Sequence, residues 1–175
     1  MFDNSQLFVI QFCAEECERQ QSGEKSVYDM INAWEYATFY SSMYCPPHTA
    51  DPEPVADHLA PPIEDIGILV EPIANKNGFR MIPIGVGNAY EWHEKADWQE
   101  VPRLLELLLD SYNTGILEPS HPLAKTSEDQ FYYEFENIHP FRDGNGRTGK
   151  ILYNYLSGTL ENPKMPPNFW GFSNP

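Results

Sequence analysis

Residues suited to catalysis gather between positions 136 and 150, where the sequence reads ENIHPFRDGNGRTGK. A free histidine side chain titrates near neutral pH, so the imidazole of His139 is of a type that can take a proton from a hydroxyl group. Asp143 offers a carboxylate of the kind that holds Mg²⁺ beside substrate phosphates. Arg147 can bind phosphate oxygens in bidentate fashion, and Lys150 adds a second positive charge. This combination favours phosphoryl or nucleotidyl transfer.

Two glycines, Gly144 and Gly146, flank Asn145 in the same stretch. They allow backbone conformations that point several N–H groups inward, which forms a nest for an anion. The helix expected to follow would add the unpaired N–H groups and partial positive charge of its first turn. Asn145 can donate its amide to a phosphate or close a turn, and Phe141 is expected to anchor the loop in the core. The loop is not a Walker loop, because the spacing GxxxxGK[ST] is absent.

Each of these residues has an ordinary alternative when it is taken alone. A single histidine is usually structural or exposed, and an Asp-Gly-Asn-Gly string is usually a turn. The three cations Arg142, Arg147 and Lys150 could form a solvated helix face. Only the conjunction of base, carboxylate, nest and cations in one loop points to transfer chemistry.

Two helices must hold this loop at their ends. The first is expected to begin near Ser120, with Pro122 in its first turn, and to end near Ile138, because Pro140 disfavours helical geometry at the residue before it. After the glycines, TGKILYNYLSGTL predicts a second helix of about twelve residues. The residues expected on the core-facing sides of the two helices are Phe131, Phe135, Ile138, Ile151 and Tyr155.

The rest of the chain predicts further helices and one β-hairpin. A strand-like run at 79–84 is followed by a glycine-rich turn at 85–88 and a return strand at 89–92. Pro83 removes a ladder donor, so the hairpin should have an exposed edge, which could pair with an extended peptide. Residues 101–113 predict a helix whose many leucines should be buried on most sides. The other expected segments are helices at 5–21, from the N-cap Ser26 to Tyr44 and at 63–71, a proline-rich connector at 45–62 and an extended tail at 162–175.

Composition restricts the class of protein. The chain has 175 residues, of which 41% are hydrophobic and 14% aromatic, and this favours one folded domain over disorder. Its formal net charge is −15. That charge argues against a nucleic-acid binder or a protein held on an anionic membrane, because both need a basic face. A small cluster of cations in such an acidic chain instead suggests one small anionic ligand.

The three cysteines, Cys13, Cys17 and Cys45, lack the spacing of a disulfide framework and favour reduced thiols in a cytoplasmic protein. Cys13 and Cys17 could share a helix face and hold a metal, although buried core thiols are the simpler interpretation. We expect no secretory signal at the N-terminus and no membrane-spanning run. The expected location is the cytoplasm, either of the producing cell or of a host into which the protein is delivered.

The stretch HPFRDGNGR, residues 139–147, resembles the signature loop of the Fic (Fic/Doc) family at every defining position. The predicted hairpin, with Gly78-Phe79-Arg80 followed by Ile82 and Ile84, resembles the family's flap. The resemblance implies a mainly α fold, a Fic-type helical bundle with one β-hairpin flap beside the active-site loop. The expected single domain spans 1–175, with its core at about 63–157, N-terminal helices and the connector at 1–62 and the tail at 158–175.

The resemblance implies an enzyme of the protein adenylyltransferase branch, which transfers AMP from Mg-ATP to a Ser, Thr or Tyr hydroxyl of a target protein. His139 would be the base that deprotonates the hydroxyl, and Asp143 would hold Mg²⁺. The residues that would bind the nucleotide and its phosphates are Phe141, Gly144, Asn145, Gly146, Arg147 and Lys150. The residues of the flap that would clamp the target's main chain are Arg80, Met81, Ile82 and Ile84.

One position departs from the family pattern, which normally has a second Arg three positions after the first. Here Lys150 keeps the charge but loses the planar fork, so γ-phosphate binding would be weaker or the donor would be UTP, GTP or a phosphocholine carrier. Doc toxins, a related branch, phosphorylate their targets and carry bulkier residues in place of the loop glycines. The intact Gly144-Asn145-Gly146 therefore favours nucleotidyl transfer. A non-catalytic binding protein on a Fic scaffold is the competing class.

Many Fic proteins are inhibited by a helix carrying [ST]-x-x-x-E-[GN], whose Glu pairs with that second Arg. The segment from Ser157 to Asn162 fits this string, but it directly follows the motif helix, which would have to fold back on itself. We therefore treat the match as accidental. Because Lys150 also replaces the usual partner, we expect a chain that is unregulated or is held by a separate antitoxin-like protein.

Overall fold

A computed structural model describes residues 4–44, 78–87, 92–114 and 127–168. In these ranges the protein is mainly helical with one small antiparallel pair of strands, which confirms the predicted fold class. The connector at 45–62 and the helix at 63–71 lie outside the described residues. The helices are α1 (Asn4–Arg19), α2 (Glu24–Tyr44), α4 (Val101–Thr114), α5 (Glu128–Ile138) and α6 (Asn145–Leu156), and the strands are β1 (Gly85–Gly87) and β2 (Trp92–Glu94).

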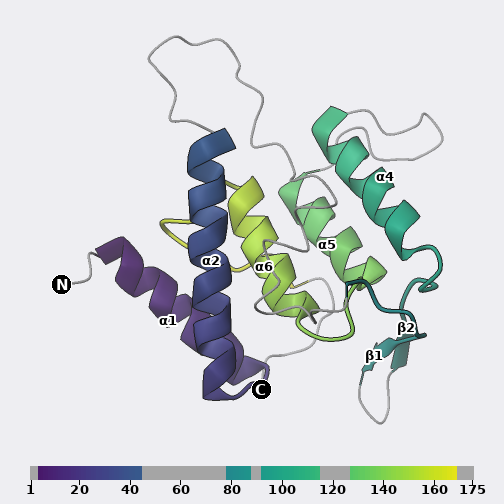
Figure 1. Ribbon diagram of the computed structural model, residues 1–175, viewed down its shortest axis with the longest axis horizontal. Helices are drawn as coiled ribbons and strands as arrows, with labels where there is room; N and C mark the ends of the chain where they lie inside the picture. The colour runs from purple at the N-terminus through teal and green to yellow at the C-terminus, as the bar shows by residue number, and fades with distance from the viewer. Residues whose placement is uncertain (1–3, 45–77, 88–91, 115–126, 169–175) are drawn as a thin grey trace.

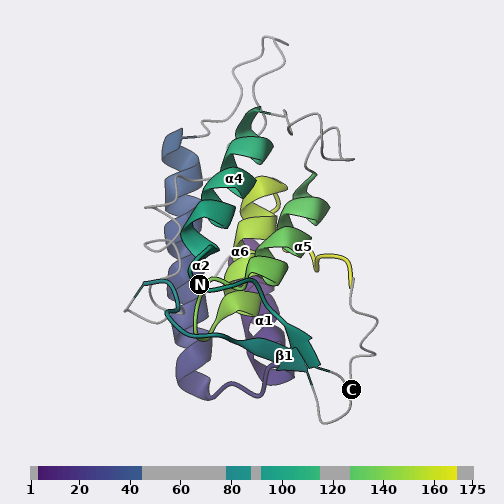
Figure 2. The same ribbon diagram turned by 90° about the vertical axis from the view of Figure 1, so that its right-hand side faces the viewer.

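Helix α6 lies at the centre of the bundle (Figure 1). It packs against α5 on one side and α2 on the other, while α1 contacts α2 and α4 contacts α5. The hairpin lies at the end of the bundle where the chain turns from α5 into α6 (Figure 2). The largest fully buried side chains, which form the core between these helices, include Trp34, Phe131, Phe135, Phe141, Ile151, Leu152 and Tyr155. The core therefore lies directly beneath the motif loop.

Three helix starts differ from the prediction. Helix α2 begins at Glu24 rather than after Ser26, whose N–H already donates to Gly23 O at 2.8 Å. Helix α5 begins at Glu128, because the Ser127 side chain accepts from Gln130 N and caps the helix there, whereas the predicted start near Ser120 lies outside the described residues. Helix α6 begins inside the glycine segment, at Asn145. At α5 a side-chain cap sets the boundary, and apolar periodicity does not report caps.

Helix α4 is amphipathic, so the prediction that it is buried on most sides is wrong. Leu105, Leu108 and Leu109 are buried, whereas Leu107 is 51% exposed and the neighbouring Glu106 is exposed. The helix lies at the edge of the bundle, where its contacts are with α5. A leucine-rich run with charged residues at helical spacing therefore covers one face only.

The hairpin forms later in the sequence than predicted. Its strands pair Gly85 with Glu94, Val86 with His93 and Gly87 with Trp92, so the predicted turn glycines belong to β1. The predicted strand at 79–84 is absent. Its main chain is used differently, because Arg80 N donates to Pro140 O at 2.8 Å and Pro83 has no N–H to donate.

Cys13 and Cys17 are free thiols in the core, which confirms their interpretation as buried residues. Burial raises the pKa of the Cys13 thiol to about 12, so it stays protonated. Within the part of the chain that the structure describes, no helix has both the length and the hydropathy that crossing a membrane requires.

Candidate active site

The motif loop joins two helix ends that approach each other. Helix α5 ends at Ile138, and His139 takes the left-handed conformation with φ 51° and ψ 63°, while its N–H donates to Phe135 O at 2.9 Å. The loop turns again at Gly144, with φ 81°, before α6 begins. A left-handed conformation costs little at glycine but about 1–2 kcal/mol at other residues. The surrounding structure must therefore hold His139 in place.

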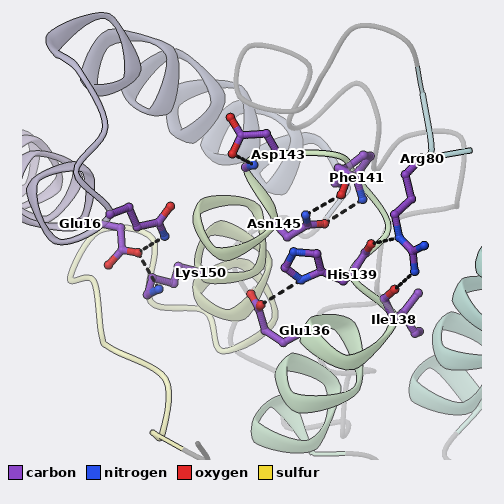
Figure 3. A network of polar contacts seen from close by, with 11 residues as sticks. Glu16, Arg80, Glu136, Ile138, His139, Phe141, Asp143, Asn145 and Lys150 are labelled. Carbon is purple, nitrogen blue, oxygen red and sulfur yellow. Dashed lines mark hydrogen bonds and ion pairs between the residues drawn. The ribbon is translucent and has the colours of Figure 1, made fainter. Parts of the chain in front are cut away.

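Asn145 and Phe141 close the loop from inside. The Asn145 side chain accepts from Phe141 N and donates to Phe141 O, both at 2.8 Å, and Asn145 is only 2% exposed. Phe141 is buried and packs against Phe79, with ring centroids 5.9 Å apart. Phe141 thus anchors the loop in the core, as predicted, and the Asn145 amide is used within the loop (Figure 3).

Asp143 lies at the exposed rim of the loop. Its side chain is 84% exposed, and its Oδ1 accepts from Gly144 N at 2.7 Å and lies 3.6 Å from Arg147 Nη2. The described residues contain no group of three or more His, Cys, Asp or Glu side chains that could hold a metal by themselves. One exposed carboxylate nevertheless fits Mg²⁺, which usually keeps several waters and takes its other ligands from substrate phosphates.

Arg147 is a buried cation with unused bonding capacity. It lies in the first turn of α6 and is 5% exposed, and its Nε has no hydrogen-bond partner among the described residues. The N–H groups of the first helical turn lack acceptors within the helix and carry its partial positive charge. Arg147 and the start of α6 therefore bring hydrogen-bond donors and positive charge to the same end of the loop, and the anion site that the sequence suggested there stays a prediction.

Lys150 already has a carboxylate partner, Glu16 of α1 (Figure 3). Lys150 Nζ donates to Glu16 Oε1 at 2.6 Å, and Glu16 is 1% exposed. The same carboxylate also accepts from Arg19 Nη1 and Gln20 Nε2, each at 2.5 Å. No local pattern in the sequence indicated this pair, because the partner of Lys150 comes from a helix that is distant in sequence.

Helix α1 also covers the glycine segment. A Cβ built at Gly146 would lie 2.6 Å from Nε2 of Gln20, which directly follows α1, so a larger residue there would require the Gln20 side chain to move. The Ser157–Asn162 segment plays no such part. Ser157 is the C-cap of α6 and Glu161 is exposed, in agreement with the view that its match to the inhibitory string is accidental.

His139 is half-buried and uncharged at neutral pH. Burial lowers its pKa to about 4, and the positive charges of Lys95 and Arg80 act in the same direction. Its Nδ1 lies 3.7 Å from Glu136 Oε2, which is too long for a hydrogen bond. Burial also raises the pKa of the Glu136 carboxyl, against the lowering influence of Lys150 and Lys95. The imidazole therefore has a lone pair available for a proton.

The predicted flap residues fall into two groups. Met81 and Ile82 are 75% and 44% exposed, and Ile84 is half-buried. Arg80, by contrast, is 3% exposed and donates to main-chain carbonyl groups, so it does not face a target. A cavity of about 660 Å³ lies beside the base of the hairpin, with Ile84, Lys95 and Trp98 in its lining.

From the sequence, no part was assigned to Glu16 or Glu136. Arg80 was expected to contact a target, whereas the structure buries this side chain. A signal for Glu16 was present, because it is spaced with Cys13, Cys17 and Gln20 to share one helix face. A carboxylate on a face of core thiols needs a buried partner. The identity of that partner, Lys150, depends on the packing of two distant helices and has no local signature.

Comparison with known proteins gives a family match over part of the chain and a likeness in fold. Residues 83–157, which contain the hairpin, α4, α5, the loop and α6, match the model of the Fic/DOC family. No curated protein matches the chain.

Among solved structures, the chain is similar to a Fic family protein from Desulfovibrio desulfuricans G20, with a TM-score of 0.54 and 19% identity over 90% of this chain and 50% of that one. It is also similar to a Fic domain containing signaling protein from Bacteroides thetaiotaomicron VPI-5482, with a TM-score of 0.49 and 21% identity over 77% of this chain and 49% of that one. The chain thus spans about half the length of each. The first likeness shows a shared fold.

Proposed function

We propose that this chain is a Fic-type protein nucleotidyltransferase that moves AMP from Mg-ATP to a Ser, Thr or Tyr hydroxyl of a target protein. The observation that carries the proposal is the buried Arg147, whose Nε has no partner in the described residues, at the start of a helix that faces a neutral His139 across a short loop. A buried N–H donor without an acceptor is costly, and an anionic ligand that accepts from it removes that cost.

The proposed reaction uses few groups. The triphosphate lies against the first turn of α6 and Arg147, with Asp143 as the protein ligand of Mg²⁺. Mg²⁺ would neutralise charge on the phosphates. His139 Nε2 takes the proton of the target hydroxyl, since Nδ1 lies towards Glu136. The hydroxyl oxygen bonds to the α-phosphorus, the bond from that phosphorus to the β-phosphate oxygen breaks, and pyrophosphate leaves.

The flap supports delivery of a protein substrate. Met81, Ile82, Val86 and Trp92 are exposed apolar side chains near the same short hairpin, and exposed apolar residues in a group mark contact surfaces. The three-residue strand β1 can also accept an extended peptide by edge pairing. The target hydroxyl would then enter between the flap and His139.

Glu16 suggests that α1 restrains the site. A phosphate that binds Lys150 must take the place of the Glu16 carboxylate, which lies 2.6 Å from Lys150 Nζ. The exchange leaves no buried cation unpaired, because phosphate oxygens accept the same hydrogen bonds. We therefore propose that the described chain holds itself in a restrained state. Under this proposal a separate antitoxin-like protein either restrains the site by binding α1 or is not needed for the restraint.

Labelling tests the proposed activity. Wild type, Glu16→Ala and His139→Ala are each incubated with a cell lysate, Mg²⁺ and ATP, UTP, GTP or CTP labelled at the α-phosphate. A protein band labelled from ATP, stronger with Glu16→Ala and absent with His139→Ala, is the expected result. No label from any of the four nucleotides with wild type or Glu16→Ala would overturn nucleotidyl transfer. A band labelled only from γ-labelled ATP would identify a kinase of the Doc kind, and retention of nucleotide binding without any label would indicate a binding protein.

A further inference from the structure

Arg80 binds three successive carbonyl groups around His139. Its Nε donates to His139 O at 2.7 Å, one Nη donates to Ile138 O at 3.1 Å, and its main-chain N donates to Pro140 O at 2.8 Å. The peptide groups before and after His139 are therefore both attached to one residue of the flap (Figure 3). Arg80 is only 3% exposed, so water does not compete for these bonds.

The location of these carbonyl groups explains why a guanidinium is used. Ile138 and His139 form the C-terminal end of α5, where carbonyl oxygens lack donors from the helix and carry its partial negative charge. His139 also has a positive φ of 51°, which costs free energy in a residue with a side chain. Bonds on both sides of His139 offset that cost, so the conformation that presents the imidazole depends on Arg80.

The same guanidinium attaches both legs of the flap. It donates to Ile82 O at 2.9 Å in the segment before β1, and to Ala96 O in the segment after β2. Ala96 N in turn donates to Asn137 O at 3.3 Å, near the end of α5. Arg80 thus joins three segments, the two legs of the hairpin and the end of α5.

From this geometry we propose that Arg80 is a positioning residue: it fixes the left-handed main chain at His139 and sets the distance between the flap and the catalytic imidazole. It would act through His139 and make no contact with nucleotide or target. Its part in the reaction rests on the proposed function, whereas its effect on the conformation of His139 does not. Lysine cannot replace it, because an ammonium group has no planar fork that reaches acceptors on several segments.

The test uses Arg80→Lys, with Arg103→Lys as the matched control. Arg103 is exposed on α4, where it pairs with Glu100 at 2.7 Å. Three quantities are measured: the coupling between the amide and α protons of His139, which reports φ; the Kd for Mg-ATP; and the kcat and KM for transfer to a target. With Arg80→Lys we expect a changed coupling, an unchanged Kd and a kcat lower by about 100-fold, the scale of a 1 Å misplacement.

Each outcome decides the proposal. An unchanged coupling at His139 in folded Arg80→Lys overturns it, and so does a loss of nucleotide affinity as large as the loss of kcat, which would indicate general disruption. If wild type transfers no nucleotide, the proposed function fails, yet the coupling at His139 still tests the claim about Arg80.

A double-mutant cycle tests the proposal if Arg80→Lys folds poorly. Glycine adopts positive φ without strain, so the fall in the urea midpoint caused by Arg80→Lys should be smaller in a His139→Gly background. An equal fall in both backgrounds contradicts the proposal.

Discussion

At the C-terminal end of α5 a cation from the flap binds neutral carbonyl groups, whereas at the N-terminal end of α6 a carboxylate from α1 binds a cation. Arg80 and Lys150 are both almost fully buried, but their partners differ in kind. The acceptors of Arg80 are main-chain atoms of the loop and the flap, so its contacts form part of the fold itself. Under the proposed function a phosphate takes the place of Glu16, so the Lys150 contact would be exchangeable. We call the end of α5 with Arg80 the fixed half of the site, and the start of α6 with Lys150 and Glu16 the exchangeable half.

The largest predicted effect tests the exchangeable half. Glu16→Ala leaves Lys150 and part of Arg19 without a buried partner, so it should lower the free energy of unfolding by about 3–5 kcal/mol. The same change should tighten Mg-ATP binding by about tenfold or more, since a competing ion pair is removed. Urea denaturation measures the first quantity and calorimetry the second.

Glu18→Ala is the control for that prediction, because Glu18 lies on the exposed side of the same helix. The double variant Glu16→Met, Lys150→Met should regain most of the lost stability, as apolar replacements of buried pairs often do. If Glu16→Ala is destabilised but binds Mg-ATP no more tightly than wild type, the carboxylate supports α1 without restraining the site.

A somewhat smaller effect is expected from Asn145→Ala, which opens the loop between the two halves. The change leaves Phe141 N and Phe141 O without their buried partners, at a cost of about 3 kcal/mol for the two groups together. Asn32→Ala on the exposed face of α2 is the control and should change stability by no more than about 0.5 kcal/mol. A loss with Asn145→Ala no larger than that of the control would show that the loop does not depend on this bridge.

The third prediction concerns pH and the fixed half. The pKa of His139 is lowered by burial to about 4 in the folded protein, so the unfolded chain binds a proton first as pH falls. Its contribution to stability is complete above pH 6.5 and is lost between there and pH 4. This predicts a loss of about 2 kcal/mol between pH 7 and pH 5.

Urea melts of wild type and His139→Asn across this pH range isolate that contribution, because asparagine tolerates left-handed φ and does not titrate. The raised pKa of Glu136 acts in the opposite direction, but Glu136 is present in both proteins, so its effect largely cancels in the difference. Parallel curves for the two proteins would show that His139 is not buried as the structure has it.

The sequence predicted the part of this site that is local. Pro140 ends α5, the glycines turn the chain, and Asp143 and Arg147 follow at fixed spacing, so the loop could be read from one stretch of letters. Phe131, Phe135 and Ile138 recur at helical spacing and are buried as expected. The helical fold class follows from the same periodicity.

The parts that were missed depend on contacts between distant segments. Glu16 and Lys150 are 134 positions apart, and Arg80 lies 59 positions before His139. A buried arginine bonded to carbonyl groups looks in sequence like any exposed arginine of a hairpin, because its acceptors are main-chain atoms. The predicted strand boundaries were wrong for the same reason, because the main-chain N–H of Arg80 donates to the loop at Pro140 O instead of to a second strand.

The smallest predicted effect separates positioning from general support of α5. Ser127 caps the far end of this helix by accepting from Gln130 N at 3.2 Å, so Ser127→Ala should cost about 1 kcal/mol in urea denaturation. Because the loss is confined to the first turn, His139 should keep its conformation and the transfer rate should stay at the wild-type value. A fall in kcat comparable to that of Arg80→Lys would mean that any weakening of α5 displaces the imidazole. Arg80 would then be one support of the helix among several, and the contrast between a fixed and an exchangeable half of the site would no longer depend on it.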